Sequence, residues 1–265
     1  MARLTVKELL GLKGKRQIVL VSAFDYWTAQ ACETAGIDML VTWSPSLEHL
    51  KVVLSQVRAG APNIFIGAGI PQNYSYISES NALEAAMIAM DLGADVIYAS
   101  GLEIGKFQAL GKQKIPFVGH VGYLPVQNTW FGGPRAVGKT CPEAIKVYHD
   151  VLAFQEAGAI AVEVECVPHK VASEITKRVD ILTFSMGSGS DCDGQFLFDC
   201  DILGSHNSHF PRHSKSYTNF YIQSVASFKQ YKEEVHNGIF PAKDHVIDMD
   251  AKEYSLFVKQ IKKEK

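Results

Sequence analysis

The stretch Ala159 to Lys170, AIAVEVECVPHK, begins as a buried strand and then becomes acidic. Its first residues are apolar and partly β-branched, which suits a strand covered on both faces of a sheet. Glu163 and Glu165 are two residues apart, so their side chains point to the same side of that strand. Two such carboxylates need a partner, a metal ion or a shared proton. The alternative is that Glu163 pairs with a structural arginine and Glu165 reaches solvent.

Strands and helices alternate on both sides of this stretch. Further apolar runs predict strands at 17–23, 38–44, 63–68, 95–100, 115–121, 180–186 and 195–200. Helices are expected between them, at 25–34, 47–59, 79–92, 103–110, 140–156 and 173–178. Short connections of this kind require parallel strands with right-handed crossovers, and eight such units close a barrel. We therefore expect an α/β fold, a (β/α)8 TIM barrel, as a single domain over residues 1–265. A capping box at Thr5 predicts a short N-terminal helix, and C-terminal helices are expected at 223–236 and 251–262.

Composition limits the possible partners. The formal charge is −2 and no run of basic residues is interleaved with aromatic ones, which argues against nucleic acid. The N-terminus is too charged for a secretory signal, and no apolar run reaches the length of a membrane span. The five cysteines form no CxxC pair, which is typical of reduced thiols. We therefore expect a soluble cytoplasmic protein that binds neither membrane nor nucleic acid.

The carboxyl ends of the predicted strands define a candidate site, because TIM barrels carry their chemistry on that face. This rule gathers several polar or small residues there: Ser44, Gly69, Ser100, His120, Glu165 and the loop 187–189. His120 is either a catalytic group or a core histidine bonded to the backbone. The glycine-rich loop could hold a carboxylate or phosphate on its amides, although no nucleotide-binding motif is present.

Several segments resemble the 3-methyl-2-oxobutanoate hydroxymethyltransferase family, which makes ketopantoate. They are Phe24-Asp25-Tyr26, HVGYLPVQ (120–127), FGGPRAVGKT (131–140), VECVP (164–168), GSGSDCDGQFLF (187–198) and DILG (201–204). The resemblance implies a barrel of the phosphoenolpyruvate/isocitrate-lyase superfamily and a homo-oligomer, commonly a decamer. It also implies Mg²⁺ beside a 2-oxo acid, removal of a proton from C3, and addition of that carbon to methylene-tetrahydrofolate. Glu165 matches the family's acid/base glutamate.

The departures from that pattern fall on the metal and substrate positions. Trp43 and Gly69 stand where the family carries metal-binding aspartates, and Ser100 stands where it carries a third carboxylate. Tyr98 replaces a substrate-binding lysine. Because these residues cannot replace an oxygen ligand or a cation, no cofactor is predicted and no residue is assigned to metal.

We therefore predict a diverged, hydroxymethyltransferase-like or lyase-like enzyme that acts on a small carbonyl compound by C–C bond or proton-transfer chemistry. Glu165 is expected to act as the base with His120 as a second catalytic residue. Residues expected to contact the substrate are Ser44, Trp43, Tyr98, Ser100, Gln72, Glu163 and Ser188. One alternative is a non-catalytic homologue that binds a metabolite or a protein partner. Another, which the lost ligands disfavour, is 3-methyl-2-oxobutanoate hydroxymethyltransferase activity itself.

A relocated metal site is a further possibility. His206, His209 and His213 have spacings of three and four residues, and several aspartates lie nearby in the sequence. Such a histidine-rich loop is more often solvated than metal-bound.

Overall fold

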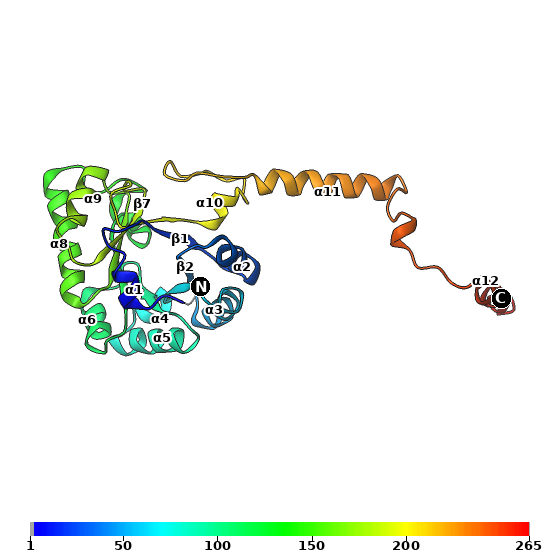
Figure 1. The fold of residues 1–265 in the computed structure, drawn as a ribbon, viewed down its shortest axis with the longest axis horizontal. Helices are drawn as coiled ribbons and strands as arrows, with labels where there is room; N and C mark the ends of the chain where they lie inside the picture. Colours follow the sequence, from blue (N-terminus) through cyan, green and yellow to red (C-terminus); the bar gives the residue numbers. More distant parts are fainter. Residues whose placement is uncertain (1–2, 265) are drawn as a thin grey trace. The chain divides into compact units, whose positions relative to one another are not determined.

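A computed structural model describes residues 3–264, and the strands among them close into a parallel barrel in sequence order (Figure 1). The last strand pairs with the first through Ile18–Val21 and Gly194–Leu197, which completes the ring. The (β/α)8 prediction is confirmed. The strands are β1 (Ile18–Ser22), β2 (Met39–Trp43), β3 (Phe65–Gly69), β4 (Val96–Tyr98), β5 (Phe117–Gly122), β6 (Ala161–Glu165), β7 (Leu182–Met186) and β8 (Gly194–Leu197).

Helices follow most of these strands and cover the outside of the barrel (Figure 1). Polar caps explain where several begin: the Asp25 side chain accepts from the N–H groups of Trp27 and Thr28, and Ser46 and Thr140 cap in the same way. The long ones are α2 (Tyr26–Ala35), α3 (Leu47–Gly60), α5 (Glu79–Asp91), α6 (Ile104–Lys112), α8 (Cys141–Ala157) and α9 (His169–Thr176). The short ones are α4 (Gln72–Ser75), α7 (Asn128–Phe131), α10 (Asp199–Leu203) and the 3₁₀ turn η1 (Pro125–Gln127).

The core has two layers. One lies between the strands and the outer helices and contains side chains such as Leu54, Ile66 and Val162. The other fills the barrel itself with larger side chains, including Phe65 and Phe184. A parallel strand buried on both faces must be apolar almost throughout, which is why the strand runs stand out in the sequence.

The amino end of the barrel is closed by α1 (Val6–Leu10) and by an ion pair whose carboxylate is buried. Leu9 is fully buried and belongs to the apolar cluster inside the barrel. Lys13 Nζ lies 2.8 Å from Asp193 Oδ2, and the same carboxylate accepts from the N–H of Thr183 at 2.9 Å. Asp193 therefore anchors the loop before β8 and lies at the end of the barrel opposite the candidate site.

The chain divides into two compact units, residues 1–203 with 208–217, and residues 204–207 with 218–265. The first is the barrel. The second contains α11 (Phe220–His236), the turn η2 (Lys243–His245) and α12 (Ala251–Ile261). The single-domain organisation stays a prediction, because it concerns how the two units associate. None of the helices in residues 3–264 combines the length and the apolar character that a membrane span requires.

Two local predictions differ from the structure. The strand expected over 195–200 ends at Leu197, and α10 begins at Asp199. The carboxylate of Asp199 accepts from Ser22 Oγ at 2.5 Å, and its N–H donates back to the same oxygen at 2.9 Å, which ties the chain to the end of β1. The helix expected to include 173–178 runs from His169, directly after Pro168, and ends at Thr176, two residues before Arg178.

Candidate active site

A cavity of about 630 Å³ lies at the carboxyl end of the barrel strands. Its size is within the range of cavities that enclose a small organic ligand. Nearly all of the residues proposed from the sequence for substrate contact or catalysis line it. They are Trp43, Ser44, Gln72, Tyr98, Ser100, His120, Glu163 and Glu165.

One histidine and two glutamates form the charged part of the cavity. His120 on β5 is the register partner of Glu163 on β6, and Glu165 follows two residues later on the same face. The Nε2 atom of His120 lies 3.0 Å from Glu165 Oε2 and 3.7 Å from Glu163 Oε1. All three residues are buried, with His120 and Glu165 each 8% exposed. The prediction that both carboxylates point to one side of the strand is confirmed.

Burial and mutual contact set the protonation of this group. Burial is the main cause that raises the pKa of Glu163 to about 7; the neighbouring Glu165 carboxylate also raises this pKa, and the attraction of His120 opposes the rise. Burial alone would lower the pKa of His120, but the Glu163 and Glu165 carboxylates outweigh it and raise that pKa. The two carboxylates therefore favour the protonated form of the His120 imidazole. Near neutral pH the neighbouring Glu163 carboxyl exchanges between its protonated and ionised forms.

Three residues that line the cavity each contain a buried polar atom without a hydrogen-bond partner. These atoms are Tyr98 Oη, Ser100 Oγ and His120 Nε2; among residues 3–264, Thr42 Oγ1 is also buried without a partner. The Nε2–H group is close to Glu165 but is not aligned with either carboxylate. Burial, helped by Glu163, raises the pKa of Tyr98, so that its phenol stays protonated and can donate. Buried donors without partners are costly, which marks this wall as a surface that a ligand would complete.

The position of Tyr98 depends on a glycine in the neighbouring strand. A Cβ atom at Gly67 on β3 would lie 2.6 Å from the Tyr98 ring. Only glycine at position 67 therefore leaves enough space for the Tyr98 ring inside the barrel.

Ser44 and Gln72 occupy the rim between β2 and α4. The Ser44 hydroxyl is 2.8 Å from Nδ1 of His49, so it already has a partner. Gln72 is the first residue of α4 and is exposed. Both line the cavity, but neither contributes an unpartnered buried atom.

The opposite wall is aromatic, and the sequence pattern predicted only Trp43 on it. Trp43 lies 5.3 Å from Phe198 between ring centroids and meets Phe24 edge-on at 4.5 Å. Phe196 on β8 and Phe198 just after it also line the cavity. Phe196 could have been predicted to face the cavity from the alternation of inward and outward positions along β8. Pro125 and Val126 could not, because they reach the cavity from η1, whose sequence has no periodic pattern.

Ser188 differs from its prediction as a substrate-contacting residue. It does not line the cavity, and it is 1% exposed. Its hydroxyl donates to the carbonyl of Val164 at 2.8 Å and accepts from the N–H of Val167 at 2.9 Å. Both hydrogen-bonding roles are thus used within the protein, and Ser188 holds the β6 and β7 loops together.

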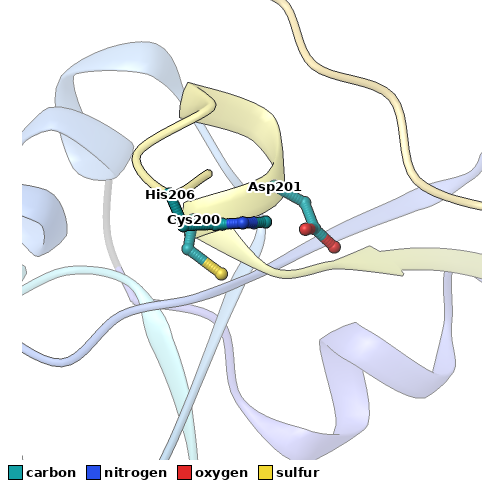
Figure 2. A group of neighbouring side chains, drawn as sticks. All are labelled: Cys200, Asp201 and His206. Atoms are coloured by element: carbon teal, nitrogen blue, oxygen red, sulfur yellow. The ribbon is translucent and has the colours of Figure 1, made fainter. Parts of the chain in front are cut away.

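Two groups of side chains have ligand-type atoms close enough for one metal ion. In His120, Glu163 and Glu165 the candidate atoms lie within 4.8 Å of one another. Cys200 and Asp201 lie on α10 (Figure 2), but His206 belongs to the other unit, so these three define no site within either unit. Within residues 3–264, His209 and His213 occur in neither group.

Comparison with known proteins gives a consistent result. The family model described as ketopantoate hydroxymethyltransferase matches residues 3–243. The 3-methyl-2-oxobutanoate hydroxymethyltransferase of Kosmotoga olearia is 33% identical over 261 residues, which cover 92% of this chain and 98% of that protein. The Thermotoga neapolitana protein of the same name is 34% identical over 259 residues, covering 92% and 96%. The solved structure of 2,3-dimethylmalate lyase, a PEP mutase/isocitrate lyase superfamily member, superposes with a TM-score of 0.60 at 11% identity, covering 94% of this chain and 92% of that one. That last likeness concerns the fold alone.

Proposed function

This chain belongs to the ketopantoate hydroxymethyltransferase family, and on that premise we propose that it is a diverged, enzymatically active member. In this proposal it removes a proton next to a carbonyl group, with Glu165 as the base. The single observation that carries the proposal is that Glu165 and His120, which lie 3.0 Å apart, line the same cavity as Tyr98 and Ser100, whose hydroxyls have no partner. A base and several hydrogen-bond donors around one point are what enolate chemistry requires.

Each group has a role in this reaction. The Glu165 carboxylate takes a proton from the carbon beside the carbonyl, and the electron pair moves to the carbonyl oxygen. Protonated His120 and the hydroxyls of Tyr98 and Ser100 donate hydrogen bonds to that oxygen as its negative charge develops. The enolate carbon then recovers a proton or attacks a one-carbon electrophile, which forms the new C–C bond. Glu163 touches His120 and sets its charge, so it acts as a positioning residue.

The family resemblance implies Mg²⁺ beside the carbonyl, and the residues at the expected strand ends do not fit it. Trp43 and Gly69 offer no oxygen ligand, and Ser100 offers only a neutral hydroxyl. Position 69 also lacks room for a carboxylate, because a Cβ atom there would lie 2.6 Å from Trp43 Cβ. No step of the proposed reaction therefore passes through Mg²⁺. Protonated His120 and the Tyr98 and Ser100 hydroxyls stabilise the enolate instead.

Location and assembly complete the proposal. The family's biosynthetic role favours a cytoplasmic enzyme that works on a small molecule. The same resemblance favours a homo-oligomer.

Proton exchange tests this function. Carbonyl compounds, including 3-methyl-2-oxobutanoate, are incubated with the protein in D₂O, and loss of the C–H signal beside the carbonyl is followed by NMR. We expect exchange with at least one compound, and a loss of about 10²-fold or more in the Glu165→Gln variant. Glu156→Gln, which changes an exposed glutamate on α8, is the matched control and should exchange at the wild-type rate.

A non-catalytic binding role is the second candidate. The unpartnered Tyr98, Ser100 and His120 atoms would serve a bound ligand equally well without any reaction. Binding of a compound by the wild-type protein without exchange of its protons would favour this role.

A further inference from the structure

The walls of the cavity carry no lysine or arginine among the residues described here. The charged groups that face it are Glu163, Glu165 and His120, so its only side-chain cation is an imidazolium already flanked by two carboxylates. Arginine is the side chain best suited to bind a carboxylate, and lysine commonly serves as well. An anionic 2-oxo acid would find neither here and would lie next to two acidic groups.

The cavity is also divided into an apolar half and a polar half. Trp43, Phe196 and Phe198 form the apolar half, on the side of β2 and β8. The Trp43 side is only partly covered, since the residue is 37% exposed. The polar half, from β4 to β6, contains the unpartnered Tyr98 and Ser100 hydroxyls and the His120 cluster. Such a division suits a molecule with an apolar body at one end and a hydrogen-bond acceptor at the other.

We propose that the ligand of this cavity is an uncharged carbonyl compound with an apolar or aromatic body, rather than an anionic 2-oxo acid. The body packs on Trp43 and Phe198, and the carbonyl oxygen accepts from the Tyr98 and Ser100 hydroxyls. A positively charged ligand is disfavoured because His120 already occupies the space between the two carboxylates. This inference rests on the proposed function, which assigns the Tyr98 and Ser100 hydroxyls to the carbonyl oxygen. It goes beyond that function because it names the class of substrate.

Trp43 offers a direct reporter of binding. The chain has three tryptophans, and the other two, Trp27 and Trp130, are 74% and 90% exposed. The Trp27→Phe/Trp130→Phe variant therefore keeps a single tryptophan on the cavity wall, and both replaced side chains lie at the surface, where substitutions cost little. Its fluorescence is titrated with 4-phenylbutan-2-one and with a matched pair, 3-methyl-2-oxobutanoate and its uncharged methyl ester.

We expect 4-phenylbutan-2-one to change the Trp43 emission, and the ester to bind at least tenfold more tightly than the acid. Calorimetric titration of the unmodified protein with the same three compounds repeats the comparison without any substitution. Binding of the acid as tightly as the ester, or more tightly, would overturn the inference. So would a failure of both uncharged compounds to bind.

A charge-gain variant tests the reason for the preference. Ser100→Lys places a cation on the polar half of the cavity, and we expect it to raise the affinity for 3-methyl-2-oxobutanoate at least tenfold relative to the ester. An unchanged ratio would mean that missing cations do not set the preference. Binding and exchange also separate the two proposals: an uncharged ketone that binds but never exchanges its protons contradicts the proposed function and leaves this inference intact.

Discussion

Trp43 and Gly69 are register partners on β2 and β3, packed so closely that a Cβ atom at position 69 would lie 2.6 Å from the Cβ of Trp43. Any side chain at position 69 must therefore push the two strands apart. We expect Gly69→Ala and Gly69→Asp each to lower the free energy of unfolding by about 1–3 kcal/mol, measured by urea denaturation. Asn73→Asp adds a carboxylate at the exposed rim of the same cavity and serves as the control. Wild-type stability of Gly69→Asp, together with stabilisation by Mg²⁺, would show that a metal ligand fits there.

The buried Glu163 carboxyl makes stability depend on pH. Its pKa is raised from 4.5 to about 7 on folding, so the folded state holds this proton more tightly than the unfolded state. The free energy of unfolding should therefore fall as the pH rises from about 4.5 to about 7, by up to about 3 kcal/mol at about 1.4 kcal/mol per pKa unit. The raised pKa of His120 acts in the same direction, because the stability it contributes is lost as the imidazolium deprotonates.

Glu163→Gln isolates that contribution. The variant should be more stable than wild type at pH 9 and no more stable at pH 5, in urea titrations read by circular dichroism. Glu156→Gln, on the surface of α8, should follow the wild-type curve throughout. If Glu163→Gln kept the full pH dependence of wild type, the carboxyl would not be the group that titrates.

The ion pair between Lys13 and Asp193 stabilises the barrel at the end away from the cavity. Asp193 is 8% exposed and also accepts from Thr183, so removal of its carboxylate leaves buried donors without a partner. Asp193→Ala is expected to cost about 3 kcal/mol, judged by urea denaturation. Asp191→Ala, two residues earlier and exposed, should change stability by less than about 0.5 kcal/mol. Equal effects of the two substitutions would show that the ion pair does not stabilise the barrel.

Ser188 should behave as a structural residue. Its replacement by alanine leaves the carbonyl of Val164 and the N–H of Val167 without their partner, which is expected to cost about 1–3 kcal/mol. The affinity of folded Ser188→Ala for 4-phenylbutan-2-one should match that of wild type in calorimetric titration. A weaker affinity with unchanged stability would show that Ser188 contacts the ligand.

The strand pattern predicted the barrel because parallel strands buried on both faces must be largely apolar, and runs such as Phe65–Gly69 and Val96–Tyr98 satisfy that requirement. The rule that barrel chemistry lies at the carboxyl strand ends then placed His120 and Glu165 on one face. The two-residue spacing of Glu163 and Glu165 added the second carboxylate.

The role of Ser188 and the positions of Val126 and Tyr98 depend on tertiary contacts, which the periodic pattern of the sequence does not predict. The Ser188 hydroxyl was free to be assigned to a ligand until its two backbone partners were known. Val126 reaches the cavity from the short 3₁₀ turn η1, and the space for the Tyr98 ring depends on Gly67 in a neighbouring strand. Tertiary packing fixes all three, and a single sequence does not contain it.

The most direct test of proton transfer by Glu165 without the family's Mg²⁺ is the rate of C–H exchange in D₂O, compared in EDTA and in added Mg²⁺. NMR would follow the same carbonyl compound under both conditions, with wild type and Glu165→Gln. We predict wild-type rates that agree within about twofold in EDTA and Mg²⁺, and a loss of about 10²-fold or more in Glu165→Gln under both conditions. Exchange that occurs only with Mg²⁺ would contradict this account and would place a functional metal ion in the cavity.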